Sequence, residues 1–353
     1  MRRHVPFQWH YEHGLALLAI GQVGQRTNQP GYLGYVKDTI DPFIDAQGKI
    51  RTYRIEEYNL DQINAGKVLF LLYNATREQR YRQALCLLRE QLKSQPRTGE
   101  GGFWHKNIYP HQMWLDGIYM ASPFYAEFAR TFGEPAAFDD VANQILLIEK
   151  HARDPKTGLL YHAWDESKQQ RWSNPATGCS PCFWGRAMGW YAMALVDVLG
   201  YMPGNHPRRD NIVAILSSTI AAVATVQDAP TGLWYQVLDQ GSRAGNYLEA
   251  SSSCMFIYAI AKGVRKGYLA ERFLETAAKG YRGVLRDLIE IDPSGEVSLK
   301  GICSVGGLGG DPYRDGSFEY YISEPVVAND YKGVGPFILA SLEMESLNAS
   351  HKK

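Results

Sequence analysis

A short turn motif recurs along the chain at intervals of about 60 residues. Each copy is a small hydroxylated residue followed by glycine and then by a short stretch with apolar or aromatic residues. The copies are Thr98-Gly99, Thr157-Gly158, Thr231-Gly232 and Ser294-Gly295, and Gln47-Gly48 is a degenerate earlier copy. The segments between the later copies are long enough for two helices. A helix pair repeated at a fixed period predicts an array of helical hairpins.

The apolar residues between these turns have helical spacing. Stripes of this kind include Ala84, Leu85, Leu88 and Leu92, and also Trp190, Tyr191, Ala194, Leu195 and Val198. Gly133, Gly200 and Gly267 each separate two helical segments and are predicted hairpin turns. Five turn copies plus the chain ends give six hairpins, and no polar capping repeat is apparent at either end. We therefore expect an all-α toroid of six helical hairpins, a single domain spanning residues 1–353.

Composition excludes several partners and cofactors. The 37 basic and 37 acidic residues balance, so no basic field predicts a nucleic acid or membrane partner. No apolar run is long enough to span a bilayer, and the start at Met1-Arg-Arg-His4 is a poor signal peptide, so a cytoplasmic location is expected. The pair Cys179 and Cys182 lacks a second pair of ligands and is interpreted as structural. The glycine-rich stretch 301–310 lacks the context of a phosphate loop, so no metal or nucleotide is predicted.

The aromatic residues favour a sugar ligand. The chain has 8 Trp, 22 Tyr and 13 Phe, and many of them neighbour glycine, histidine or charged residues. A sugar ring has apolar C–H faces and hydroxyl edges, which suit this mixture. The alternative for any single aromatic residue is an ordinary place in the core.

Two aspartates are candidates for catalysis. Asp116 interrupts an apolar and aromatic run, with Trp114 before it and Tyr119 after it, and Asp61 also stands at the start of a predicted helix. An aspartate in such a place is either a helix N-cap or a carboxyl whose pKa is raised by burial, as a general acid requires. The pattern alone slightly favours the cap and leaves both readings open.

The segment Gln112-Met-Trp-Leu-Asp-Gly-Ile-Tyr-Met120 resembles the hallmark of glycoside hydrolase family 105, the unsaturated rhamnogalacturonyl hydrolases. The related family 88 contains the unsaturated glucuronyl hydrolases. Supporting similarity runs over nearly the whole chain: Asn59-Leu-Asp61, His105-Lys106, Phe183-Trp-Gly-Arg-Ala-Met-Gly-Trp-Tyr191 and Ser323-Glu-Pro-Val-Val-Ala-Asn-Asp-Tyr-Lys-Gly-Val-Gly335. Gly185-Arg-Ala-Met188 departs from the Arg-Gly-Asn core of many members, which leaves the pocket shape there open.

The resemblance implies an (α/α)6 barrel and an unusual hydrolysis. The substrate would be an oligosaccharide whose non-reducing end is a 4,5-unsaturated uronic acid. Asp116 would donate a proton to C4 and then accept one from the water that adds to C5, with Asp61 as a second catalytic carboxylate. The resemblance implies no cofactor, and it assigns substrate binding to His105, Lys106, Asn107, Tyr109, His162, Trp184, Arg186 and Trp190.

Other interpretations stay open at this point. The enzyme could be an unsaturated glucuronyl hydrolase, or a conventional inverting glycosidase with Asp116 as acid and Asp61 as base. A non-catalytic sugar-binding toroid is a third possibility. Arg186 could be a structural ion-pair partner, His162 a satisfied loop histidine and Trp190 a core residue. A monomer or weak homodimer is expected, and the leaving sugar is not specified.

Overall fold

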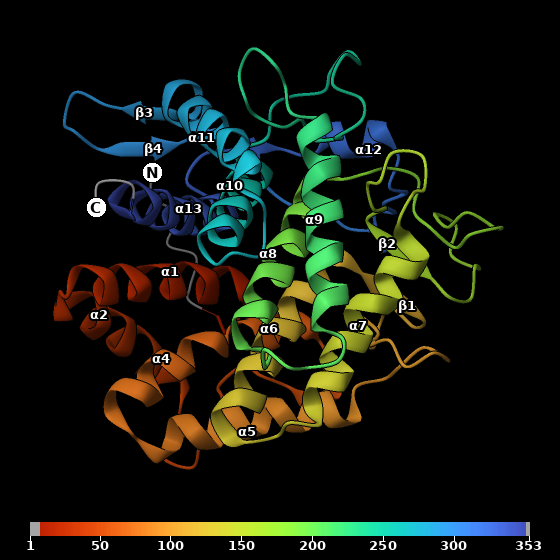
Figure 1. The fold of residues 1–353 in the computed structure, drawn as a ribbon. Coiled ribbons are helices and arrows are strands. Elements are labelled where there is room, and N and C mark those ends of the chain that lie inside the picture. The colour runs from red at the N-terminus through yellow and green to blue at the C-terminus, as the bar shows by residue number, and fades with distance from the viewer. Residues whose placement is uncertain (1–7, 351–353) are drawn as a thin grey trace.

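The computed structural model describes residues 8–350. The prediction made on Met1-Arg-Arg-His4 lies outside this range. Within it, helices at six positions form an inner ring, because each packs against the next and the last packs against the first (Figure 1). These are α1 (Tyr11–Thr27), the broken helix α3 (Leu60–Asn64) and α4 (Lys67–Thr76), α6 (Leu115–Phe132), α8 (Gly185–Tyr201), α10 (Ala250–Arg265) and α13 (Tyr331–Ser350).

Five outer helices surround this ring, and each packs against the inner helix before it. They are α2 (Pro30–Ile40), α5 (Gln79–Ser94), α7 (Ala137–Ala152), α9 (Arg209–Thr225) and α11 (Leu274–Gly283). The sixth inner position is filled by α13, and no outer helix follows it in the described residues. The predicted all-α (α/α)6 barrel is confirmed, with α13 standing where a sixth hairpin was expected.

Short elements lie in the connections. Three antiparallel strand pairs are β1 (Gln112–Trp114) with β2 (Ala163–Asp165), β3 (Ile289–Ile291) with β4 (Val297–Leu299), and β5 (Ile302–Cys303) with β6 (Val326–Val327). The remaining helical pieces are η1 (Asp41–Phe43), η2 (Ile55–Glu57), η3 (Glu271–Phe273), the π-helical η4 (Val284–Leu288) and α12 (Phe318–Ser323). Pairing of β1 with β2 sets Trp114 opposite Ala163 and so brings the start of α6 beside His162.

The repeated turns share a backbone conformation. Gly48, Gly158, Gly232 and Gly295 all have φ between 73° and 85°, which glycine adopts without a steric penalty. In the remaining copy the residue with positive φ is Gly101 rather than Gly99. The expectation of a turn at Gly200 was wrong, because α8 continues through Tyr201.

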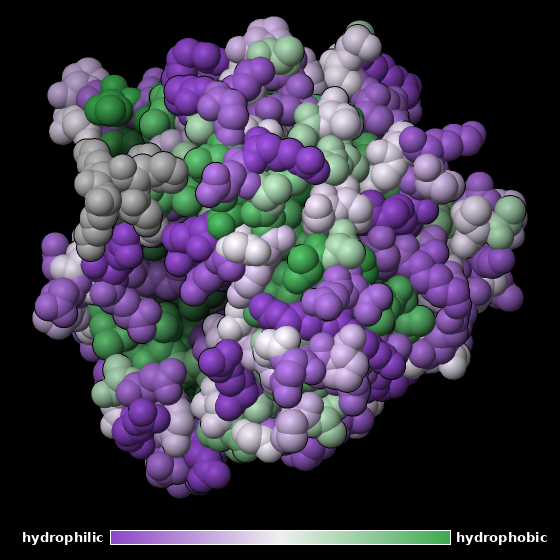
Figure 2. Space-filling model, in the orientation of Figure 1, coloured by the Kyte–Doolittle hydropathy of each residue, from purple (hydrophilic) through white to green (hydrophobic). Residues whose placement is uncertain are grey.

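The core extends through the barrel, and α8 is buried along almost its whole length. Cys179 and Cys182 are buried free thiols, and the Cys179 thiol donates to the His151 carbonyl. On the face drawn in Figure 2, polar residues predominate and interrupt the apolar areas. None of the helices in the described range is both long and apolar enough to cross a bilayer.

Candidate active site

Three predicted site residues begin inner helices at the same end of the barrel. Asp61, Asp116 and Arg186 are each the second residue of their helix, in α3, α6 and α8. The N-terminus of a helix carries partial positive charge, and several such ends facing one opening favour a negatively charged ligand. The fold therefore suits this mouth to an anionic sugar before any side chain is considered.

Asp116 does not cap α6. The N-cap position is Trp114, and no side chain makes a capping hydrogen bond there. The Asp116 side chain is 13% exposed, and its Oδ2 lies 3.0 Å from His162 Nε2. The angles at this contact do not meet those of a hydrogen bond, and both atoms are buried with no other partner. Unsatisfied buried polar atoms are uncommon in folded proteins and tend to mark functional sites.

His162 is completely buried immediately before β2. Its Nδ1 lies 2.7 Å from the Tyr321 hydroxyl, which comes from α12 near the far end of the chain. The indole of Trp184 stacks on the Tyr321 ring with centroids 5.5 Å apart, and Trp114 meets the imidazole edge-on at 5.1 Å. These contacts hold the imidazole in one orientation toward Asp116.

Asp61 is an ion-paired carboxylate rather than a cap. The side chain of Asn59 caps α3 by accepting the Asp61 N–H. Lys106 Nζ lies 2.6 Å from Asp61 Oδ2, and His105 Nε2 lies 3.5 Å from Oδ1. Burial opposes the charge on Asp61, but Lys106 and His105 outweigh it and lower the pKa of this carboxyl to about 2. The second carboxylate of the site is therefore held ionised.

His105 connects the two aspartates. Burial lowers the pKa of His105 to about 4, so its imidazole is neutral at physiological pH. Its ring stacks on Trp114 at 4.7 Å, and Trp114 also makes an edge contact with His162 at 5.1 Å. A Cβ atom at Gly117 would lie 2.9 Å from His105 Nδ1, so a glycine directly after Asp116 gives the imidazole its space.

The Arg186 guanidinium has several partners, but one of its nitrogens has none. Its side chain donates to the Ser251 hydroxyl at 2.8 Å and to the Cys303 carbonyl, and it lies 3.5 Å from the buried carboxylate of Glu249. Its Nη1 is buried without a hydrogen-bond partner. The ion-pair interpretation of Arg186 thus holds, and one arm of the guanidinium remains available.

The other predicted binding residues differ in burial and in their contacts. Trp184 and Trp190 are each 1% exposed, and Trp190 stacks on Tyr119 at 4.8 Å, so their contact with a sugar stays a prediction. Tyr109 accepts a hydrogen bond from Arg314, whereas Asn107 is exposed.

The predicted site residues do not include Tyr11, Tyr321 or Glu249, although the segment Tyr313–Tyr321 has the polar and aromatic density of a site. Tyr11 is partly buried at the start of α1, and its pKa is raised by burial and also by the charges of Glu12, Asp61 and Asp116, while Arg186 lowers it. Tyr11 therefore lies within the electrostatic reach of all three helix-start residues. Its place in the Trp9-His-Tyr-Glu-His13 segment, rich in aromatic and titratable residues, was the available signal.

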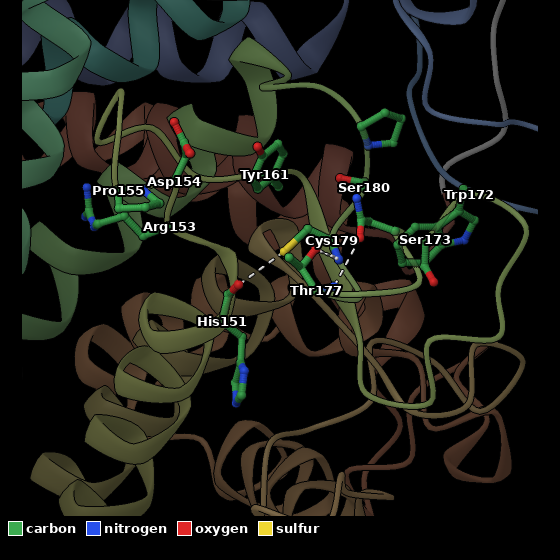
Figure 3. Close-up of a pocket in the computed structure, with 12 residues that line it drawn as sticks. His151, Arg153, Asp154, Pro155, Tyr161, Trp172, Ser173, Thr177, Cys179 and Ser180 are labelled. Atoms are coloured by element: carbon green, nitrogen blue, oxygen red, sulfur yellow. Dashed lines mark hydrogen bonds between the residues drawn. The ribbon is translucent and has the colours of Figure 1, made fainter.

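A separate cavity of about 450 Å³ lies between the end of α7 and the loop that leads to α8 (Figure 3). Its walls include Asp154, Tyr161, Trp172 and Ser180, and none of the ten predicted site residues lines it. Trp172 also packs in a small apolar cluster with Trp114. The cavity is thus a neighbour of the candidate site and does not contain it.

Comparison with known proteins identifies the family. Residues 3–348 match the sequence profile of Glycosyl Hydrolase Family 88. The chain belongs to this family. A solved glycoside hydrolase of family 105 from C. acetobutylicum is 52% identical, with a TM-score of 0.95 over 96% of this chain and 94% of that one. A possible family 105 member from Salmonella enterica is 26% identical, with a TM-score of 0.81 over 96% of this chain and 84% of that one.

Two further relatives are known from sequence. A protein of Agrobacterium fabrum is 41% identical over 233 residues, which are 64% of this chain and 97% of the relative. An unsaturated rhamnogalacturonyl hydrolase of Bacillus subtilis is 27% identical over 255 residues, 70% of this chain and 69% of the relative. The chain is therefore a glycoside hydrolase of the family 88 and 105 group, the unsaturated glycuronyl hydrolases.

Proposed function

We propose that this family 88 protein removes a 4,5-unsaturated uronic acid from the non-reducing end of rhamnogalacturonan fragments by hydrating the C4=C5 bond. The observation that carries the proposal is the contact between Asp116 and His162, two buried groups 3.0 Å apart that have no other partner at the facing atoms. This arrangement places a carboxyl group with a buried, otherwise unpartnered oxygen beside an imidazole, in the short-range geometry that general acid catalysis requires.

The steps balance as an addition of water. The Asp116 carboxyl donates its proton to C4, and the electron pair of the double bond forms the new C–H bond. The positive charge then lies on C5 and the ring oxygen, beside the Asp116 carboxylate and the ionised Asp61. Water adds to C5 and gives a proton to Asp116, which restores the acid. The resulting hemiketal opens and releases the next sugar.

The charge state of Asp61 favours hydration over conventional inverting hydrolysis. An inverting enzyme needs one carboxylate as the base that activates water. The contact with Lys106 lowers the pKa of Asp61 to about 2 and makes it a weak base. Asp61 is better suited to stabilise a neighbouring positive charge, with Asp116 serving as acid and base in turn.

The positive charges at this mouth of the barrel also suit the carboxylate of a uronate substrate. Helix starts, the free Nη1 of Arg186 and Lys106 give this mouth the positive partial charges that a uronate needs. The rhamnogalacturonan specificity rests on the Bacillus subtilis relative, whose name states that activity. An unsaturated glucuronyl hydrolase on other oligosaccharides would use the same machinery.

The test is an activity panel with Asp116→Asn as the control. Wild-type protein should remove the ultraviolet absorbance of the conjugated uronate from unsaturated rhamnogalacturonan disaccharides and leave the saturated disaccharides intact. Asp116→Asn should lose at least about 100-fold in kcat while it still binds the disaccharide, because it lacks the proton to donate. Equal cleavage of saturated and unsaturated disaccharides would contradict hydration, and full activity of Asp116→Asn would exclude the assigned acid.

A further inference from the structure

The barrel has a second opening, at the end opposite Asp61 and Asp116. A chamber of about 470 Å³ lies there, and every inner position of the ring contributes to its walls. The residues used below are Arg26 of α1, Lys67 of α4, Glu127 of α6, Tyr201 of α8, Arg265 of α10 and Glu343 of α13. Glu127 follows Asp116 by eleven residues on the same helix, which places it roughly 16 Å further along the helix axis. The chamber is therefore separate from the candidate active site.

Lys67 in the wall of this chamber has a buried amine without a hydrogen-bond partner in the described residues. The residue is 4% exposed, and its Nζ has no hydrogen-bond partner in the described part of the chain. The Nζ atom lies 3.5 Å from the centre of the Tyr119 ring, which contributes a cation–π contact but no counter-charge. A buried ammonium group is stabilised when an anion faces it, so an anion bound beside Lys67 would favour its charged form.

Several other charged groups around the chamber are already paired, whereas Glu127 is hydrogen-bonded to Tyr201 and attracts Lys67 electrostatically from beyond ion-pair distance. Arg265 binds Glu343 through two contacts of 2.5 and 2.8 Å. Asp197 of α8 accepts from Lys262 at 2.6 Å and from Tyr258 at 2.7 Å. In the described residues, no carboxylate lies within ion-pair distance of Lys67 or of Arg26 at the rim.

Residues at helix ends and amide side chains in the walls also contribute to the chamber. Arg26 lies in the last turn of α1, where it offsets the negative partial charge of the helix C-terminus. The side chains of Gln22, Gln25 and Asn74 also line the walls and present amide groups suited to hydroxyls. A chamber of this volume is in the range of small-molecule sites.

We propose that the chamber is a second ligand site that binds a small hydroxylated carboxylate of the size of a sugar acid, with the carboxylate on Lys67. The ligand would provide the anion that Lys67 lacks, and its hydroxyls would contact the amides on the walls. The chamber residues named here make no hydrogen bond or ion pair with Asp116 or His162 in the described structure, and the link to the candidate site runs through Tyr119, which contacts Lys67 and stacks on Trp190.

The titration of Lys67 and Glu127 makes anion binding in the chamber depend on pH. Burial lowers the pKa of Lys67 to about 7, and burial raises the pKa of Glu127 to about 7. As the pH falls through this value, Lys67 gains a positive charge and Glu127 loses a negative one. Asp197, Lys262, Arg265 and Glu343 stay paired, and Arg26 stays charged. An anion should therefore bind more tightly below pH 7 than above it.

Calorimetric titration of the full chain with D-galacturonate tests the proposal. We expect Lys67→Met to weaken binding at this site by about 10-fold or more, since a buried charge loses its partner. Its hydrolase activity should be unchanged. D-galactose, which lacks the carboxylate, should bind wild type and variant equally. Because Lys67→Met could fold poorly, Asn74→Asp provides a second variant that adds negative charge on an exposed wall residue.

Each outcome decides the proposal. Weaker galacturonate binding in both variants, with tighter binding at pH 6 than at pH 8 in wild type, supports it. Absence of binding, or binding that neither variant changes, overturns it, because the sugar acid would then be held elsewhere or not at all. Failure of the hydrolase assay would leave this result untouched, since the two sites are measured separately.

Discussion

At the scale of single residues, the site is organised around one imidazole. His162 meets Asp116 through Nε2 and the Tyr321 hydroxyl through Nδ1, so the hydrogen bond at one nitrogen influences which protonation state the other presents. Tyr321 is completely buried, and burial raises the pKa of its hydroxyl well above the ordinary value. The hydroxyl therefore stays protonated, and we expect Tyr321 to act as a positioning residue that orients the His162 imidazole toward Asp116.

Replacement of Tyr321 by phenylalanine tests this role. Tyr321→Phe removes one hydrogen bond and leaves Nδ1 of His162 buried without a partner. An unsatisfied buried polar atom of this kind costs about 1–3 kcal/mol. We expect kcat to fall by roughly 10- to 100-fold with little change in KM, and the pH profile of kcat to shift. Tyr320→Phe is the matched control on the same helix, since Tyr320 donates to no atom of the Asp116 and His162 pair. An unchanged pH profile would show that Tyr321 only fills space.

At the scale of elements, the repeated turns determine where each hairpin closes. Asp228 begins one turn, and its carboxylate accepts from the N–H and the hydroxyl of Thr231. Asp154 does the same for Thr157, and Asp292 for Ser294. The aspartate, the hydroxylated residue and the glycine with positive φ thus form one unit, of which sequence reasoning recognised the last two members.

Two glycines with nearly equal φ separate backbone strain from packing. A Cβ atom at Gly232 (φ +79°) would lie 2.6 Å from the Lys279 carbonyl, whereas one at Gly133 (φ +75°) would meet nothing within 4 Å. Gly133→Ala should therefore cost only the strain of positive φ, about 1–2 kcal/mol. Gly232→Ala should cost clearly more, because the α11 backbone must move. Chemical denaturation of both variants measures the difference, and equal losses would contradict the packing argument.

The parts of the site that sequence could predict are those close together along the chain. The turn repeat predicted the barrel, and the residues at helix starts, Asp61, Asp116 and Arg186, follow from the motifs around them. The contact of Tyr321 with His162 could not be found in this way, because it spans 159 residues of chain. The same holds for Glu249, whose partner Arg186 lies on another helix. Whether Asp116 caps α6 also depended on the backbone at Trp114, which no pattern specified.

At the scale of the whole molecule, opposite ends of the barrel respond differently to acid. Near the active site, the folded pKa of His105 is about 4 against 6.5 in an unfolded chain, and that of Asp61 is about 2 against 3.8. The unfolded chain therefore binds more protons in these ranges, and the free energy of unfolding falls as the pH drops through them. In the chamber, the folded pKa of Glu127 is about 7 against 4.5, so Glu127 adds stability as the pH drops from 7 to 4.5.

These opposing contributions predict a stability profile with two regions. Between pH 7 and 4.5 the gain from Glu127 offsets the loss from His105, at about 1.4 kcal/mol for each unit of pKa displacement. Below pH 4.5 only losses remain, from His105 and then from Asp61, so stability should fall steeply. Glu127→Gln removes the gain, and its free energy of unfolding should decline from pH 6.5 downward without a plateau. Urea denaturation of wild type and Glu127→Gln across this range measures both curves, and parallel curves would show that Glu127 does not titrate between pH 7 and 4.5.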